Sequence, residues 1–291
     1  MIRAALTVLM LCGLAACSER SAQSPADVAK PALWAIGDRE GATLGWLFGT
    51  IHALPDGAPW QSAALDRAIG DAGILVVEVR DLDPQRTAAL FNRIATDEPS
   101  PPLTGRLPPD VGADLATFLA SKGVSAGKFD NLETWAAALS LSRLAGAAEV
   151  ANGVDKAIIA RFAGRPVAEL EGVAEQLGIF DGLPEPEQRK LLGAVLAEQS
   201  DPGADARALA AAWRAGDLAA LERQTRRGLL ADPALYEALA AGRNRDWLGK
   251  LGPMLAGGRR PLVAVGTAHM LGPDGLPALL AAEGYRIRRL Q

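Results

Sequence analysis

The chain contains two histidines, and both end the same tetrapeptide at the close of an apolar run. His52 ends Gly-Thr-Ile-His, and His269 ends Gly-Thr-Ala-His. The runs that precede them, residues 44–48 and 261–265, are typical of buried β-strands. Neutral imidazole is a common metal ligand and a common general base. The matched strand ends therefore predict one site that is assembled from two distant parts of the sequence.

The first residues have the pattern of a targeting segment. Residues 4–14 are apolar and are shorter than the about 20 residues of a membrane-spanning helix. The sequence Leu-Ala-Ala-Cys that ends at Cys17 resembles a bacterial lipobox, in which cleavage before the cysteine exposes a thiol that carries diacylglycerol. We therefore expect a signal peptide at residues 1–16, followed by a lipidated Cys17 and a flexible tether up to residue 31. An ordinary signal peptide, which would leave Cys17 free, is the alternative.

A lipid on Cys17 implies the periplasmic face of the cell envelope. The outer membrane is favoured because Ser18, and not aspartate, follows the cysteine. Cys12 would leave with the signal, so the mature chain would have no thiol for a disulfide or a sulfur-ligated metal. A metal site would then use histidine with carboxylate or amide ligands. The formal net charge of −4 gives no electrostatic footprint for nucleic acid.

Strand patterns gather at both ends of the mature chain, and helical patterns fill the middle. The ends predict a hairpin of strands 32–36 and 44–51, helix 60–70 and strand 73–79, and then strand 261–265, helix 275–283 and strand 285–290. The middle predicts helices at residues 84–96, 108–122, 132–147, 155–162, 173–180, 184–199, 204–215, 218–230 and 233–255, with one short strand at 166–171. The last helix is expected to be interrupted near Gly242 and Pro253. We therefore predict a single α+β domain at residues 32–291, with a pseudo-symmetric sheet core from both chain ends wrapped by a large helical middle segment.

Several charged residues are candidates for chemistry. Glu78 interrupts an apolar strand, where an unpaired carboxylate would be costly, so it is either paired with Arg80 or used as a metal ligand or general base. Glu169 and Glu171 alternate on the short strand and share a face, which is either solvated or directed to the site. Arg243 lies in a helical stretch, and it either faces solvent or binds a carboxylate or carbonyl oxygen.

Other residues have mainly structural interpretations at this level. Asp155 is expected to be a helix N-cap. Gln176 is expected on a helix surface or in a polar network. The glycines of the two matched motifs permit close approach of the backbone, and the threonine hydroxyls are placed to orient an imidazole. The sequence contains no nucleophile elbow, no Walker loop, no dinucleotide-binding glycine motif and no His-Glu-x-x-His.

The paired Gly-x-x-His motifs and the segments between them resemble the TraB/GumN family, which includes the TIKI-type metalloproteases. The matching segments, in order, are "LWAIGDREGATLGWLFGTIHALP", "ILVVEV", "GVDKAIIARFAGRPVAELEGVAEQL", "GRNRDW" and "VAVGTAHMLGPDGLPALLAAEGYRIRRL". They cover about residues 32–290. The resemblance implies an α+β fold similar to the erythromycin esterase/ChaN-like superfamily.

The resemblance also implies a set of site residues. TIKI members are metal-dependent peptidases that favour Mn or Co, and this implies a divalent ion here, with Zn as a further option. The family motifs carry over to His52, His269 and Glu78 as metal ligands. Arg243 and Asn244 match the Arg-Asn pair of the family, and both are candidate catalytic residues.

The function implied by the resemblance is a metal-dependent, peptidase-like hydrolase that is held in the envelope by the lipid on Cys17. Its substrate would be a peptide or protein. The metal would activate water, while Glu78 and Glu171 would serve in catalysis, Glu171 as the base, and Arg243 would stabilise the oxyanion. One alternative is a non-enzymatic haem- or metal-binding envelope lipoprotein, since ChaN-like relatives bind haem. Another is an accessory factor with a vestigial site. The sequence carries no signal for an oligomeric state.

Overall fold

The computed structural model describes residues 29–291, apart from residues 53, 56, 82, 97–100, 145–152 and 198–201. The predicted signal peptide, Cys17 and most of the predicted tether lie outside the described residues, as do the predicted helix ends at residues 147 and 199. Within the described ranges, none of the helices combines the length and the apolar composition that crossing a bilayer requires.

Six strands of the described residues form one mixed sheet in the order β4-β3-β5-β2-β1-β6. Their bounds are β1 Leu33–Gly37, β2 Thr43–Thr50, β3 Ile74–Val77, β4 Val167–Glu169, β5 Pro261–Gly266 and β6 Arg286–Arg289. Strands β4, β3, β5 and β2 are parallel to one another, whereas β1 is antiparallel to both β2 and β6. The predicted hairpin is confirmed, and strands from both ends of the chain meet at the centre of the sheet.

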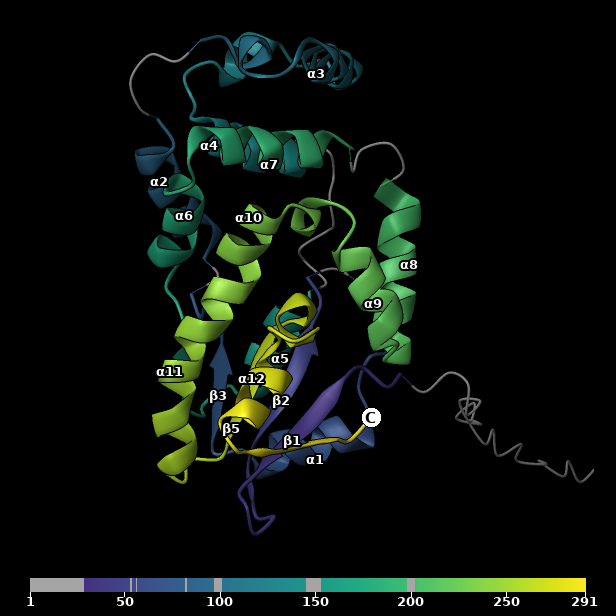
Figure 1. Ribbon diagram of the computed structural model, residues 1–291, viewed down its shortest axis with the longest axis vertical. Helices are drawn as coiled ribbons and strands as arrows, with labels where there is room; N and C mark the ends of the chain where they lie inside the picture. Colours follow the sequence, from purple (N-terminus) through teal and green to yellow (C-terminus); the bar gives the residue numbers. More distant parts are fainter. Residues whose placement is uncertain are drawn as a thin grey trace, which may run out of the picture.

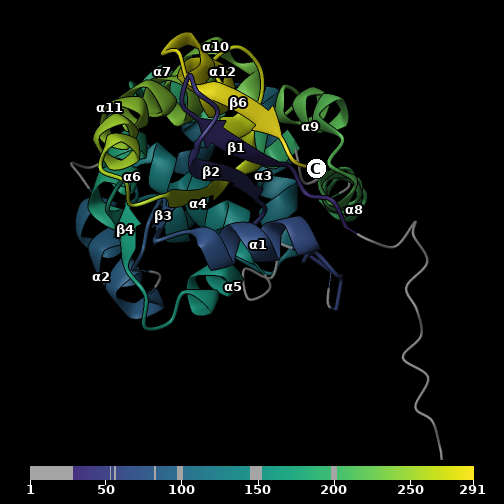
Figure 2. The same ribbon diagram turned by 90° about the horizontal axis from the view of Figure 1, so that it is seen from below.

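Helices cover both faces of this sheet (Figure 2). The bounds of the helices are α1 Ala63–Asp71, α2 Pro84–Ile94, α3 Pro109–Ser121, α4 Thr134–Leu144, α5 Val154–Arg161, α6 Val173–Asp181, α7 Glu185–Ala197, α8 Pro202–Ala215, α9 Leu218–Thr225, α10 Pro233–Tyr236, α11 Gly242–Ala256 and α12 Leu276–Ala282. Because side chains alternate along a strand, Phe48 and Ala264 pack in the core shared with α1 and α5, while Leu47 and Val263 pack in the core shared with α11 and α12. The centre of the sheet is therefore buried on both sides.

The helical middle of the chain lies mainly beyond the carboxyl ends of the parallel strands, at the top of Figure 1. Helices α2, α3, α4, α6 and α7 have a hydrophobic core of their own, which includes Trp135, Leu115 and Leu191. This confirms the predicted helical segment and the α+β class, and it adds a second core to the one at the sheet. The helices form a cap over the edge of the sheet where the candidate residues emerge.

The helix predicted at residues 233–255 consists of three parts. Helix α10 runs into a π-helical turn, Glu237–Ala241, and α11 follows without a gap. The predicted interruption near Gly242 is thus a π turn, whereas Pro253 lies inside α11 and does not end it. A π turn inserts an extra residue into a helix, and such turns are frequent at functional sites.

Candidate active site at the carboxyl ends of four parallel strands

Each of the four neighbouring parallel strands is followed, within three residues, by an ionisable side chain. Glu171 follows β4, Glu78 follows β3, His269 follows β5 and His52 follows β2. The carboxyl ends of parallel strands meet at one edge of a sheet, and this edge is the usual place for a binding site. The sheet therefore brings together four residues that are widely separated in the sequence.

The two Gly-Thr-x-His motifs lie side by side, because β2 and β5 pair in parallel with Thr50 opposite Gly266. The Thr267 hydroxyl donates to the Thr50 carbonyl at 2.8 Å and joins the two strand ends. A side chain on Gly49 would lie 2.9 Å from the Thr267 hydroxyl oxygen, which explains why glycine is used there. Both motif glycines are closely approached, but by side chains, since Glu78 Oε1 would lie 3.2 Å from a side chain on Gly266.

His52 is held by an acidic side chain on α5. Its Nδ1 lies 2.9 Å from Asp155 Oδ2, and the Thr50 hydroxyl donates to the other oxygen of Asp155 at 2.5 Å. The hydrogen bond to Asp155 raises the pKa of His52 from 6.5 to about 9, against the opposing effect of burial. His52 is therefore protonated at neutral pH, although its side chain is 73% exposed.

Asp155 was predicted to be a helix N-cap, and this prediction is wrong. The N-cap of α5 is Gly153, and Asp155 lies in the first turn of the helix. Burial opposes ionisation of Asp155, but the hydrogen bond and charge of His52 and the hydrogen bond from Thr50 together outweigh it and lower the pKa of the carboxyl group. Helix α5 also contacts the backbone next to His52, since the Val154 N–H donates to the Ile51 carbonyl at 3.0 Å.

Arg243, at the start of α11, joins three of the four strand-end residues. It donates to both oxygens of Glu171 at 2.9 and 2.7 Å, and to Glu78 Oε2 at 2.7 Å. One Nη1 hydrogen reaches His269 Nε2 at 3.2 Å, and the other reaches the Leu239 carbonyl at 3.1 Å. That carbonyl belongs to the π turn, so the irregular helix supplies one of the acceptors.

His269 is buried in a 3₁₀ turn, Thr267–Met270, and has a defined tautomer. Arginine has no acceptor, so His269 Nε2 must accept from Arg243 and Nδ1 must carry the hydrogen. This hydrogen points to Asn244 Oδ1 at 2.7 Å, while the Asn244 amide donates to the carbonyls of Asp274 and His269. Burial is the main cause that lowers the pKa of His269 to about 4, so the ring is neutral.

Glu78 lies one residue beyond the end of β3, and not inside the strand as predicted. Its partner is Arg243 and not Arg80, and the Gly266 N–H donates to Glu78 Oε1 at 2.7 Å. Burial favours the neutral acid, but the charge of Arg243, the Gly266 N–H and the charge of His52 together outweigh it and lower the pKa of Glu78. Glu78 is therefore an ionised, hydrogen-bonded carboxylate.

The two glutamates of the short strand separate, contrary to the prediction that they share a face of that strand. Strand β4 ends at Glu169, which is exposed and accepts from the Arg80 N–H at 2.9 Å. Glu171 is buried beyond the strand end, where the Trp247 indole N–H donates to it at 2.8 Å in addition to the bonds from Arg243. Glu171 therefore supports Arg243 from the side away from His52.

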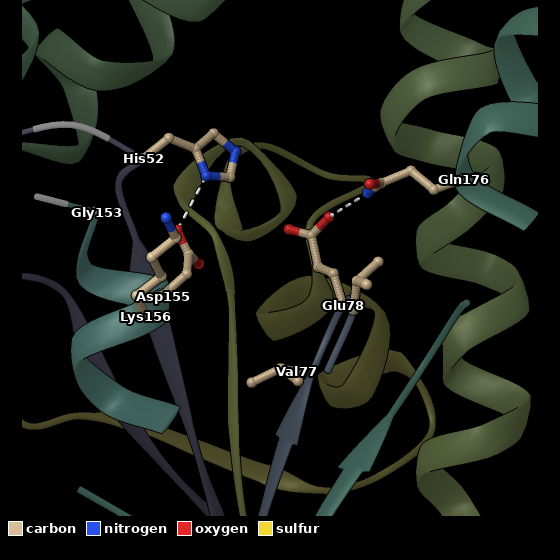
Figure 3. Close-up of a pocket in the computed structure, with 8 residues that line it drawn as sticks. His52, Val77, Glu78, Gly153, Asp155, Lys156 and Gln176 are labelled. Atoms are coloured by element: carbon tan, nitrogen blue, oxygen red, sulfur yellow. Dashed lines mark hydrogen bonds and ion pairs between the residues drawn. The ribbon is translucent and has the colours of Figure 1, made fainter. Parts of the chain in front are cut away.

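A pocket of about 120 Å³ lies between His52 and Glu78. Figure 3 shows the imidazole and the carboxylate facing each other across it, with Gln176 directed to Glu78 at 3.4 Å. Lys156, Asp155 and the backbone of Gly153 complete one wall. Ligand pockets usually have about 300–1,000 Å³, so this one fits a single reacting group and not a whole large ligand.

Glu171 and Arg243 do not line this pocket, and instead line a groove of about 1060 Å³. The groove runs between α6 and the loop to α7 on one side and the α10–α11 segment on the other, and it also includes Trp247 and Lys250. The pair formed by Arg243 and Glu171 therefore borders the groove, while the pair formed by Arg243 and Glu78 reaches the pocket. Asn244 is buried behind both and touches neither.

The predicted metal ligands do not fit an ion together in this arrangement. In favour of an ion, both histidines have Nδ1 held by a side-chain acceptor, as metal-binding histidines do. Against it, His269 Nε2 already accepts from Arg243, and Glu78 Oε2 accepts from the same guanidinium. Over the described ranges, no three residues of the ligating types form a group that could hold a metal. The structure differs from the predicted metal site because Glu78 and His269 already use their ligating atoms to accept hydrogen bonds from Arg243.

The fold and the clustered side chains define an α+β protein with a pocket, lined by ionisable side chains, at the carboxyl ends of the parallel strands of its sheet. The TraB/PrgY/gumN family model matches residues 32–289, so the chain belongs to this family. Comparison with curated proteins and with solved structures gave no match. The family predicted from the paired motifs is therefore confirmed.

Sequence reasoning missed three residues of the site. Asp155 gave no signal, because its partner His52 is more than one hundred positions away and Asp is common at helix starts. Gln176 was expected on a helix surface or in a polar network, but nothing in the sequence marked Glu78 as the group that it contacts. Trp247 had a usable signal, since it lies four residues after Arg243 and thus on the same face of a helix.

Proposed function

We propose that this chain is a hydrolase that uses His52 as a general acid and Glu78 as a general base in the small pocket between them. The observation that supports this proposal is the pair of environments shown in Figure 3. The Asp155 hydrogen bond raises the pKa of His52 to about 9, whereas the charge of Arg243 and the Gly266 N–H lower the pKa of Glu78 although burial opposes this. Two facing groups with pKa values driven apart are the usual mark of an acid and a base.

The reaction follows from these two protonation states. A water in the pocket would donate to the ionised Glu78, and would attack the carbonyl carbon of the substrate as its proton passes to the carboxylate. His52 would then give its Nε2 proton to the leaving nitrogen or oxygen as the bond breaks. Asp155 keeps the imidazole oriented and charged during this step. Glu78 and His52 exchange protons with solvent to return to their first states.

The predicted roles of Arg243 and Glu171 change in this proposal. Arg243 holds the Glu78 carboxylate in place, and Glu171 holds Arg243 through two hydrogen bonds. Both are positioning residues, because neither lines the pocket. No step is assigned to a metal ion, since two of the three predicted ligands, Glu78 and His269, accept hydrogen bonds from Arg243.

The proposal also includes a peptide-like substrate and a location at the cell envelope. The peptide class comes from the resemblance to TIKI-type peptidases, and the lipid-anchored periplasmic location comes from the lipobox at Cys17. The exposed imidazole supports a substrate that is larger than the pocket, since His52 is reachable from solvent.

The test is hydrolysis of fluorogenic peptide and ester libraries by the full chain in detergent. We expect His52→Gln and Glu78→Gln each to lower the rate by about 10² or more, the usual size of a general acid or base effect. Glu283→Gln, an exposed carboxylate at the end of α12, should leave the rate unchanged. Full activity in the His52 variant would rule out the proposed acid, and a haemin titration of the same sample would test the binding-protein alternative.

A further inference from the structure

The guanidinium of Arg243 has an acceptor for every hydrogen it carries. A guanidinium has five N–H donors. In this chain they go to the two oxygens of Glu171, to Glu78, to His269 and to the Leu239 carbonyl. Only 11% of the Arg243 side chain is exposed, and it stacks over the Trp247 ring with 4.8 Å between the guanidinium carbon and the ring centre. Because all five N–H groups are hydrogen-bonded, the guanidinium is held in one orientation.

The atoms around Arg243 include those a divalent ion would use. They are Glu78 Oε2, both oxygens of Glu171 and His269 Nε2. His269 Nε2 lies 4.0 Å from Glu78 Oε1, so these donors surround one small volume. An ion that took them would have to displace the guanidinium or lie against a like charge that is shielded from solvent.

The charges in this volume are also matched to an arginine. Glu78 and Glu171 both accept from the guanidinium, and His269 accepts at Nε2 while its Nδ1 faces Asn244 Oδ1, so the ring is a neutral acceptor. The bidentate bond to Glu171 fits the planar fork of a guanidinium, which a spherical ion does not reproduce. The neutral imidazole acts here as an acceptor for Arg243 and not as a free ligand.

We propose that Arg243 is the resident cation of this site and takes the place of the divalent ion that the family resemblance implies. The chain then has a positive charge beside Glu78 that chelators cannot remove. This inference concerns the cation alone, so it holds or fails whichever reaction the pocket carries out.

The test measures bound metal and needs no substrate. The full chain is treated with a chelator, incubated separately with Mn, Co or Zn, desalted and analysed by mass spectrometry for metal. Each chain is compared with the same chain carrying His269→Ala, and only the bound metal that this substitution removes is counted as metal at this site. We expect none in the wild type, and about one ion per chain in Arg243→Ala, because Glu78, Glu171 and His269 are then released. Arg245→Ala, on the same helix but exposed, is the matched control and should resemble the wild type.

Two results would overturn the proposal. One is a wild-type chain that holds about one ion that His269→Ala removes. The other is a folded Arg243→Ala chain that gains no ion, since Arg243 would then not be what occupies the place of the cation. Circular dichroism checks the fold. If Arg243→Ala does not fold, the wild-type measurement decides, because an ion that depends on His269 contradicts the proposal and its absence supports it.

Discussion

Replacing Asp155 by asparagine should lower the pKa of His52 and leave His269 unaffected. The substitution keeps the shape of the side chain and removes the negative charge 2.9 Å from the imidazole. The Asp155 hydrogen bond is the largest cause of the rise in the pKa of His52 from 6.5 to about 9. Most of that rise should therefore disappear in the variant.

The size of the change can be bounded from the structure. A rise of about 2.5 pH units corresponds to about 3.4 kcal/mol, which is the upper limit for the interaction. Because the His52 side chain is 73% exposed, solvent screens the pair, and a coupling of about 1 kcal/mol is the realistic value. The pKa of His52 should thus fall by about 0.7 pH unit.

Nuclear magnetic resonance measures this directly, because the chain has two histidines and therefore two imidazole signals. One signal should titrate near pH 9, and the other should stay neutral through the neutral range, since burial lowers the pKa of His269 to about 4. A His269→Gln chain assigns the signals. Asp66→Asn, which removes an exposed carboxylate paired with Arg161, is the control. A His52 signal that titrates equally in the wild type and in the Asp155 variant would refute the reasoning.

Three further predictions concern stability. The raised pKa of His52 stabilises the fold fully below pH 6.5, and this contribution is lost as pH rises through about 9. The free energy of unfolding in urea should therefore fall by up to about 1 kcal/mol over that window, and should stay level in Asp155→Asn. Asn244→Ala should cost about 2–4 kcal/mol in urea unfolding, because it strips partners from two carbonyls and a buried imidazole. Gly153→Ala should cost about 1–3 kcal/mol, since its new carbon would lie 2.6 Å from the His52 carbonyl oxygen. Gly193→Ala, where nothing lies within 4 Å of the new carbon, is the control and should show no loss of stability in the same urea unfolding measurement.

Much of the sheet could be predicted because its signals are local. Alternating and apolar runs marked the hairpin and the central strands, and the repeated tetrapeptide marked two strand ends that prove to be neighbours. The order of the strands had no such signal, since β5 enters between β2 and β3 only through tertiary packing. The second core, formed by the helices of the cap, could not be predicted either, because the periodicity of a helix shows its apolar face but not the helix against which that face packs.

The candidate site could be predicted as a set of residues but not as a set of contacts. His52 and His269 were recognised by their places at strand ends and Glu78 by its charge within an apolar run, and the structure puts all three at one edge. The direction of Arg243 toward Glu78 and Glu171 depends on a π turn, which no propensity marks. The partner of His52 was hidden for a different reason, because Asp155 also satisfies the rules for an ordinary helix start.

The position of β5 between β2 and β3 has a consequence for how the chain matures. Strands β2 and β3 are synthesised early but do not touch in the finished sheet, and β5 separates them after nearly two hundred further residues. Contacts so distant in sequence form late and slowly. His52 and Glu78 can therefore face each other only after the last part of the chain has been made. A nascent or truncated chain would therefore lack the pocket between His52 and Glu78 on which the proposed hydrolysis depends.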